Sequence, residues 1–407
     1  MTKKVACFAL GGHITTQNAS YKKLIQCLEP QGYRFFGAED GFKAFDTGNV
    51  YELTSDCIPR EFAGFIAGAG RNSLTNKDGT INYESLEKAK DFFKRGKFDI
   101  AVGSGGDNHG MQMDILNKHL DNLDVYVLNK TMDNDLGGMD GTGGAPHTDF
   151  TNGFHSAVVH CTNMIRQHYA GAWTNNLPYL IGHFGRESNW VGIAASYWGL
   201  ADKLIYGELS EEHPGHSLET IAENITEAQD RNEKEYGRRF AMVVVPEGSK
   251  IQGINHASQE LGDVHGHPKL QPELLVNELK TALETKYNLK TQTIGLTYEL
   301  RNFTPTNRDL NLAESSAKII AKTILEGKSG MESTFKIQEN RIVIGTKAIE
   351  KVSKKRLASY YPKQLINPDT FEITEEIGEY YKPLFGQREN LRDWLPNKPS
   401  VVNIYED

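Results

Sequence analysis

The feature that most constrains the fold of this chain is a pair of acidic turns, each of which follows a short apolar run. The apolar run at 125–128 leads into KTMDND at 130–135, and the run at 100–103 leads into GSGGDN at 103–108. Each run is predicted to be a buried strand that ends in a turn carrying a carboxylate. Because the carboxyl ends of neighbouring parallel strands meet at one edge of a sheet, we expect the two turns to lie side by side there.

Strand-like and helix-like runs alternate along the 407 residues, which is typical of βαβ units with a mostly parallel sheet. The length is sufficient for two or three lobes. Predicted strands occupy 5–10, 33–37, 100–103, 125–128, 179–183, 240–245 and 291–298. Predicted amphipathic helices occupy 18–27, 83–95, 110–120, 153–170, 218–232, 272–286 and 309–327.

The composition argues against several classes of protein. A formal net charge of -8 disfavours a nucleic-acid partner, because duplex binding depends on Lys and Arg that neutralise phosphates. The apolar run at 5–10 is too short for a signal sequence or a membrane span, so we expect a cytoplasmic protein with no membrane partner. The four cysteines form no C-x-x-C pair and are predicted to be reduced thiols outside the chemistry.

Three glycine-containing turns, at 11–12, 103–108 and 129–135, suit a phosphate group. Glycine lets backbone N–H groups approach an anion closely, and the start of a following helix adds a favourable dipole. Phosphoryl transfer also requires a positioned base, cations and usually Mg²⁺ held by one or two carboxylates. The candidates for these parts are Asp107, Asp133, Asp135, Lys130, Arg71 and Arg186.

The sequence does not match two well-known ligand-binding loops, the calcium loop of the EF-hand and the Walker A phosphate-binding loop. The acidic residues at 131–135 alternate as in a calcium loop, but Gly137 occupies the fifth ligand position and no Glu completes the loop. No Walker A sequence, G-x-x-x-x-G-K-[ST], occurs in the chain. A nucleoside triphosphate would therefore have to be held by another architecture.

Together these motifs resemble those of the phosphofructokinase family, and most closely its longer pyrophosphate-dependent bacterial branch. The string T-x-D-N-D is highly specific in this context, and the other matches follow in the same order. They are Gly11, Gly12 and Asn18; 40–42; Gly70 and Arg71; 105–107; 130–135; 149–154; Gly185 and Arg186; Glu247 and Gly248; 265–267; and 298–301. The resemblance implies an α/β fold of two Rossmann-like lobes with mostly parallel sheets.

The resemblance also implies how the chain is divided. Residues 1–150 would form a lobe that binds the donor phosphates, and 151–330 a lobe that binds the sugar phosphate. A C-terminal segment, 331–407, would pack back on the lobes. A homodimer or homotetramer is expected, because related enzymes place their sites near subunit boundaries.

Roles are carried over to the matching residues one by one. Asp133 would be the base that takes the proton of the sugar hydroxyl, with Thr131 and Asp135 beside it. Asp107 would hold the Mg²⁺ cofactor, and Arg186 would stabilise the phosphoryl group in transfer. The donor phosphates would be lined by Gly11, Gly12, Arg71, Gly106, Asn108 and Lys130. The sugar phosphate would be bound by Gly185, Glu247, Tyr298 and Arg301.

Two positions bear on the donor. In this family an Asp after G-G-D and a Lys before T-x-D-N-D resemble the pyrophosphate users, whereas Gly at both positions resembles the ATP users. Lys130 matches the first pattern, and Asn108 has nearly the volume of Asp without its charge. Pyrophosphate is therefore the expected donor, with ATP as the alternative.

Two other positions depart from the family. The arginines that relatives send across a subunit boundary to the sugar phosphate should fall near Leu177 and near Gln292, and both are missing. The cations nearest to the second position are Lys286 and Lys290. The expected reaction is reversible transfer from pyrophosphate to fructose 6-phosphate, giving fructose 1,6-bisphosphate. The alternatives are an ATP-dependent enzyme, a kinase of another sugar phosphate such as sedoheptulose 7-phosphate, and a catalytically silent regulatory subunit.

Overall fold

The chain forms two compact units in this computed structural model. The structure describes residues 2–138, 145–185, 188–207, 215–254, 257–258, 269–356, 358, 364–393 and 395–396. Unit 1 consists of Met1–Ala157, Ser258–Lys269 and Tyr298–Pro362, and unit 2 of Val158–Ala257, Leu270–Thr297 and Lys363–Asp407. The units do not coincide with the consecutive segments 1–150, 151–330 and 331–407 expected from the sequence, because the chain passes between them several times.

Unit 1 is built on a seven-stranded sheet in the order β13-β12-β5-β4-β1-β2-β3. The strands from β12 to β2 are parallel, and β13 and β3 pair antiparallel at the two edges. The strand bounds are β1 (Lys3–Ala9), β2 (Tyr33–Ala38), β3 (Val50–Leu53), β4 (Ile100–Gly105), β5 (Asp124–Asn129), β12 (Met331–Gln338) and β13 (Arg341–Ala348).

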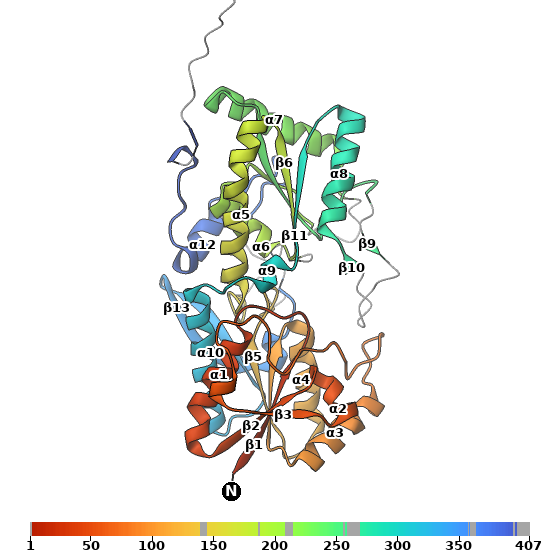
Figure 1. The fold of residues 1–407 in the computed structure, drawn as a ribbon, viewed down its shortest axis with the longest axis vertical. Helices are drawn as coiled ribbons and strands as arrows, with labels where there is room; N and C mark the ends of the chain where they lie inside the picture. Colours follow the sequence, from red (N-terminus) through yellow and green to blue (C-terminus); the bar gives the residue numbers. More distant parts are fainter. Residues whose placement is uncertain are drawn as a thin grey trace, which may run out of the picture. The chain divides into compact units, whose positions relative to one another are not determined.

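Helices cover both faces of this sheet (Figure 1). Alternate residues of β1 point to opposite faces, so Val5 and Cys7 pack in one cluster while Ala6 and Phe8 pack in another. The first cluster includes α1 and α10, and the second includes α3 and α4. The helices are α1 (Gln17–Leu28), α2 (Ala44–Thr47), α3 (Tyr83–Gly96), α4 (Asp107–His119), α9 (Glu299–Asn302), α10 (Asn307–Leu325) and α11 (Ile349–Val352).

Unit 2 contains a four-stranded parallel sheet in the order β11-β6-β8-β7. Its strands are β6 (Pro178–His183), β7 (Lys203–Leu204), β8 (Ala241–Pro246) and β11 (Gln292–Leu296). Helices α7 (Leu218–Tyr236) and α8 (Pro272–Tyr287) pack on one face, and α6 (Trp190–Gly199) contacts β7 and β8. The long helix α5 (Phe154–Asn175) leads from unit 1 into this sheet, and β9 (Ala257–Ser258) and β10 (Lys269–Leu270) form a separate pair.

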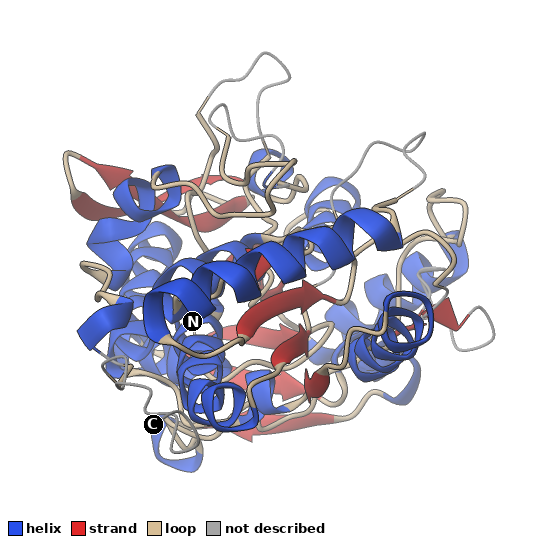
Figure 2. Cartoon of the chain, turned by 90° about the horizontal axis from the view of Figure 1, so that it is seen from above, coloured by secondary structure: helices blue, strands red, loops and turns tan. Residues whose placement is uncertain are grey.

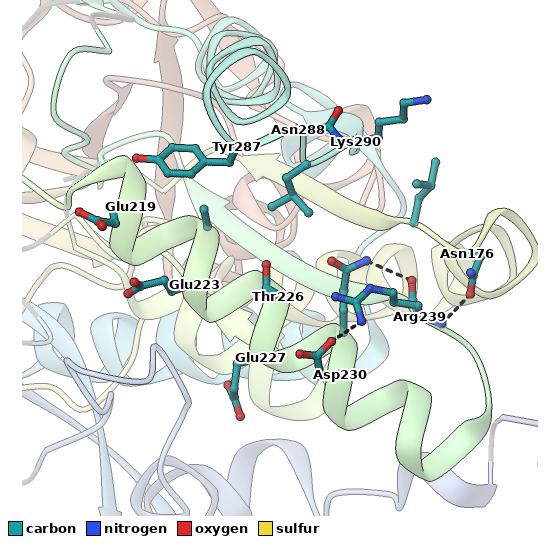
Figure 3. A pocket seen from close by; sticks show the side chains of 14 residues that line it. Asn176, Glu219, Glu223, Thr226, Glu227, Asp230, Arg239, Tyr287, Asn288 and Lys290 are labelled. Atoms are coloured by element: carbon teal, nitrogen blue, oxygen red, sulfur yellow. Dashed lines mark hydrogen bonds and ion pairs between the residues drawn. The ribbon is translucent and has the colours of Figure 1, made fainter.

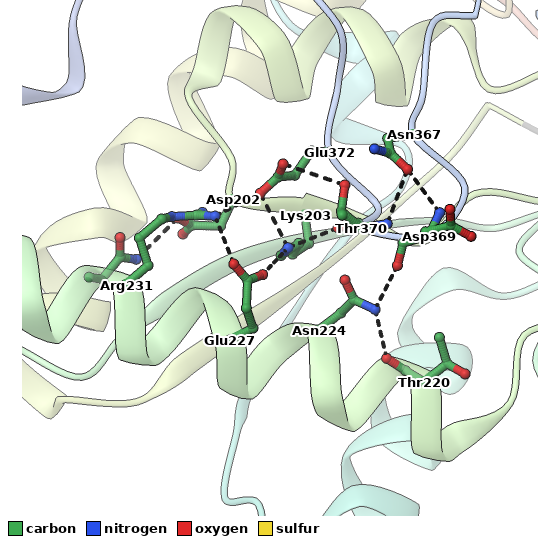
Figure 4. A network of polar contacts seen from close by, with 11 residues as sticks. Asp202, Lys203, Thr220, Asn224, Glu227, Arg231, Asn367, Asp369, Thr370 and Glu372 are labelled. Carbon is green, nitrogen blue, oxygen red and sulfur yellow. Dashed lines mark hydrogen bonds and ion pairs between the residues drawn. The ribbon is translucent and has the colours of Figure 1, made fainter.

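The C-terminal segment of unit 2 is held by buried charge. The Lys203 side chain is fully buried, and its Nζ donates to the Thr370 carbonyl at 2.8 Å and to Glu372 Oε1 at 3.3 Å. Arg231 bridges Glu372 at 2.7 Å and Asp202 at 3.0 Å (Figure 4). These ion pairs fix 367–372 on the sheet, and the later helix α12 (Glu376–Phe385) packs against α6.

The predicted α/β class with mostly parallel sheets is confirmed, and strands lie between helices in both views (Figures 1 and 2). Every predicted strand and helix has a counterpart. The prediction missed α6, because all of its residues are buried and it carries no polar stripe. All four cysteines are free thiols, as expected. Within the described residues, no helix is sufficiently long and apolar to span a bilayer.

Candidate active site

The three glycine turns lie at adjacent strand ends of unit 1. Strand β4 pairs with β1 on one side and β5 on the other, while the chain runs from β1 to β2 on the opposite side of β1. This reversal makes the carboxyl edge at β1 and β4 the topological switch point, where open α/β sheets bind ligands. Gly11, with φ +79°, donates its N–H to the Gly70 carbonyl at 2.9 Å, which places exposed Arg71 next to this turn.

The second turn is the start of a helix. Gly106 is the N-cap of α4, so half-buried Asp107 and Asn108 stand in its first turn. The prediction began this helix at 110 and left both residues in a loop. The helix begins at the aspartate, whose Oδ1 accepts the Asn108 N–H at 2.7 Å. A Cβ placed on Gly106 would lie 3.7 Å from the Thr131 Cβ, so this turn meets the third one.

The third turn carries two buried carboxylates. Asp133 is 9% exposed and Asp135 is 6% exposed. The Asp133 N–H donates to Thr131 Oγ1 at 3.1 Å, and Asn134 adopts the left-handed conformation with φ +56°. The threonine therefore shapes the backbone that presents Asp133.

A neighbouring segment supports this loop. Thr151 Oγ1 donates to the Thr131 carbonyl at 2.6 Å, and the Thr131 N–H donates to the Asn152 carbonyl at 3.1 Å. Asn152 Nδ2 donates to the Asn129 carbonyl at 3.0 Å. The sequence showed 149–154 only as a family motif without a role, and the structure assigns it the role of bracing the acidic loop.

Lys130 connects the first and third turns. Its buried Nζ donates a hydrogen bond to the Gly12 carbonyl. Burial and the Arg301 guanidinium lower the pKa of Lys130 to about 7, while Asp133 acts in the opposite direction. An anionic ligand here would favour the charged ammonium, because an opposite charge offsets the cost of burial.

Arg301 lies against the turn after β1. A Cβ on Gly12 would come within 2.4 Å of Arg301 Nη1, so a side chain at this position would displace the guanidinium. His13 Nε2 and Asn302 Oδ1 are 2.5 Å apart, which holds α9 on the same turn. The sequence placed Arg301 and Tyr298 in a sugar-phosphate lobe at 151–330. In the structure both belong to unit 1, and Tyr298 is 54% exposed.

The fit of Mg²⁺ to this edge depends on Asp107. Mg²⁺ is usually held by one or two carboxylates and by substrate phosphates, and not by a cage of protein ligands. The half-buried carboxylate at the start of α4 suits this arrangement. No group of three His, Cys, Asp or Glu side chains with metal-binding geometry occurs in the described part of the chain.

Unit 2 brings together two of the other predicted residues. The Gly185 N–H donates to Glu247 Oε1 at 3.2 Å, and the Glu247 N–H donates to the His183 carbonyl at 2.9 Å. They therefore lie at the adjacent carboxyl ends of β6 and β8. Gly185 has φ +149°, which favours glycine. Arg186 and the loop at 265–267 lie outside the described residues.

The opposite edge of the unit 2 sheet contains the two positions that lack the family arginines. Leu177 precedes β6 and Gln292 begins the neighbouring β11. Leu177 lines an open hollow of about 1040 Å³ between α7, α8 and the sheet (Figure 3). Its charged lining is Glu219, Glu223, Glu227, Asp230, Arg239 and Lys290. Because carboxylates outnumber cations, this hollow does not suit a phosphate group.

Curated proteins with either donor are similar to this chain. A protein of Dictyoglomus thermophilum named pyrophosphate--fructose 6-phosphate 1-phosphotransferase is 23% identical over 79% of this chain and 86% of its own length. A protein of the same name from Thermoproteus tenax is 26% identical over 88% and 96%. An ATP-dependent 6-phosphofructokinase of Persephonella marina is 24% identical over 79% and 93%.

Solved structures share the fold over nearly the whole chain. The pyrophosphate-dependent phosphofructokinase of Marinobacter aquaeolei matches with a TM-score of 0.73, 16% identity and 98% coverage of both chains. That of Nitrosospira multiformis matches with a TM-score of 0.74, 16% identity and 99% coverage of both. A family model described as Phosphofructokinase matches residues 4–324. The chain therefore belongs to the phosphofructokinase family.

Proposed function

We propose that this protein is a pyrophosphate-dependent 6-phosphofructokinase. It transfers a phosphoryl group from pyrophosphate to the C1 hydroxyl of fructose 6-phosphate, releasing phosphate and fructose 1,6-bisphosphate. Family membership supports a phosphotransferase that acts on a sugar phosphate. The observation that carries the choice of donor is the buried Lys130 side chain bound to the Gly12 carbonyl in the donor turn.

Lys130 and Asn108 favour the smaller donor for different reasons. A compact diphosphate bound at this turn would bring concentrated negative charge to Lys130 and favour its protonated form, and burial would strengthen that attraction. Asn108 stands one residue beyond Asp107 in the first turn of α4. A side chain there occupies space that the α-phosphate of a nucleotide would need, and a glycine would leave that space open.

The mechanism begins with proton removal by Asp133. Its carboxylate accepts the proton of the sugar C1 hydroxyl as that oxygen attacks the transferred phosphorus in line with the leaving phosphate. Lys130 and the Gly12 N–H stabilise the negative charge on the donor, and Arg186 is assigned to the phosphoryl group in transfer. Mg²⁺ held by Asp107 would neutralise donor phosphate charge. Pyrophosphate and a phosphate ester have comparable transfer potential, so the reaction is reversible.

Another sugar phosphate is the second candidate acceptor. Leu177 and Gln292 lie at the amino edge of the unit 2 sheet, and Leu177 lines a hollow rich in carboxylates. Neither residue provides the charge-assisted bonds of an arginine fork to a phosphate group. Sedoheptulose 7-phosphate is such an acceptor, with the same transfer chemistry, and ATP remains the alternative donor. We also propose that the protein is a homodimer or homotetramer in the cytoplasm.

The choice of donor is tested by the double variant Asn108→Gly with Lys130→Gly. The ratio of kcat/KM for ATP to that for pyrophosphate should rise at least about tenfold, because space is gained and a cation is lost. Lys118→Ala is the control, since this half-exposed cation lies on the same helix α4 and pairs with Asp114. An unchanged ratio in the double variant would contradict the donor assignment.

A further inference from the structure

The acidic loop has a second support from a distant part of the chain. Residues 352–356 run antiparallel to 134–138, with Leu136 and Lys355 forming a β-bridge. The Gly137 N–H donates to the Val352 carbonyl at 2.8 Å, and the Gly138 N–H donates to the Lys354 carbonyl at 2.8 Å. All of these residues belong to unit 1. The second half of the loop is thus paired with a segment beyond the region that the family model matches.

At the end of this segment, Arg356 donates three hydrogen bonds to the carbonyl groups of three consecutive residues in the loop. Its backbone N–H donates to the Asp135 carbonyl at 2.5 Å. In the side chain, Nη2 donates to the Asn134 carbonyl at 2.8 Å and Nε donates to the Leu136 carbonyl at 2.9 Å. The residue is fully buried. A buried guanidinium without carbonyl or carboxylate partners would be very costly, so these bonds define its orientation.

The loop requires such donors because its backbone is irregular. Asn134 has φ +56°, outside the helix and strand regions, and its carbonyl accepts from the Arg356 side chain. A guanidinium holds its N–H groups in a rigid plane and can serve two carbonyls at once. The ammonium group of a lysine lacks that fixed geometry. Arginine is therefore the residue type that can fix this part of the loop.

We infer that Arg356 is a positioning residue for the reaction, acting through the backbone of the acidic loop. It fixes the carbonyls of Asn134 and Leu136, on either side of Asp135, and so holds the Asp133 carboxylate in the geometry needed to accept a proton. Thr151 and Asn152 brace the first half of the loop, and Arg356 braces the second. This inference rests on the proposed function of Asp133.

The test compares Arg356→Gln and Arg356→Lys with the wild-type enzyme. We expect Arg356→Gln to lower kcat roughly 10- to 100-fold with less than about a threefold change in KM, because misplacing a catalytic group affects chemistry more than binding. Arg356→Lys should recover part of that loss. Hydrogen exchange of the free enzyme should become faster at 131–138 in Arg356→Gln, whatever the substrate.

Two control variants separate positioning from general stability. Lys354→Gln removes an exposed charge from the same segment and leaves its backbone pairing with Gly138 in place. Lys203→Met removes a buried cation from unit 2. Neither should accelerate exchange at 131–138. If Arg356→Gln does not fold, Arg356→Lys supplies the same comparison at smaller amplitude.

The measurements of kcat and of hydrogen exchange test the role of Arg356 separately from the proposed function. Normal kcat and unchanged exchange at 131–138 in a folded Arg356→Gln protein would overturn the inference, as would an equal rise in exchange in Lys203→Met. A fall in kcat together with faster exchange confined to this loop would support it. If wild-type protein turns over no donor, the proposed function fails, while the exchange measurement still shows whether Arg356 fixes the loop.

Discussion

Among individual residues, Asp133 is the base that we propose, and its nearly buried carboxylate stands in a loop braced on both sides. Asp133→Asn keeps the size of the side chain and removes the base. We expect kcat to fall about 100- to 10,000-fold with KM little changed, as for loss of a general base. Asp121→Asn, an exposed change in the turn before β5, is the control. Near-normal turnover of Asp133→Asn would exclude it as the base.

Lys130 gives a prediction about pH. Its folded pKa of about 7 is lower than the value in an unfolded chain, so between about pH 7 and 10 the unfolded chain holds a proton that the folded chain lacks. Stability from this residue therefore rises with pH across that window, and its cost is fully present below pH 7. The free energy of unfolding of wild-type protein, relative to Lys130→Met, should grow by roughly 1 to 4 kcal/mol from pH 6.5 to 9.5. Denaturant titrations at both pH values that give equal differences would contradict the burial of its charge.

Among the elements, the contact between α10 and the start of α5 includes one buried carboxylate. Asp309 accepts the Gly153 N–H at 3.2 Å and the Ser156 N–H at 3.1 Å, and burial raises its pKa. Asp309→Asn replaces one acceptor oxygen by a donor, so one N–H loses its partner. We expect a loss of about 1 to 3 kcal/mol in the free energy of unfolding, measured with denaturant. The exposed Lys318→Ala on the same helix is the control, and equal stabilities of the two variants would refute this role.

The elements also show what the sequence can predict. The strands before the glycine turns and the adjacency of β1, β4 and β5 follow from apolar runs and βαβ order, and the structure agrees. The sequence does not predict that Arg301 lies against Gly12, because this proximity depends on how the chain returns to unit 1 after β11. Arg356 had no local signal, since its partners are carbonyl groups more than 200 residues earlier in the chain. Long-range pairing of this kind leaves no periodic pattern in a sequence.

In the whole molecule, the proposed base and the donor turns belong to unit 1, and Glu247, the proposed sugar-phosphate ligand, belongs to unit 2. The family and the fold are established by the match over residues 4–324 and by the whole-length structural likeness. Relatives that use pyrophosphate and relatives that use ATP have similar identities to this chain, so likeness alone does not choose the donor. That choice depends on Lys130 and Asn108.

A single assay of the purified protein examines that choice. Mg²⁺ and fructose 6-phosphate are supplied with either pyrophosphate or ATP, and the formation of fructose 1,6-bisphosphate is followed by a coupled reaction. Asp133→Asn serves as the blank for contaminating kinases. We predict turnover with pyrophosphate and at least about tenfold lower kcat/KM with ATP. Turnover with ATP alone would contradict the roles given to Lys130 and Asn108, and no turnover with either donor would contradict fructose 6-phosphate as the acceptor.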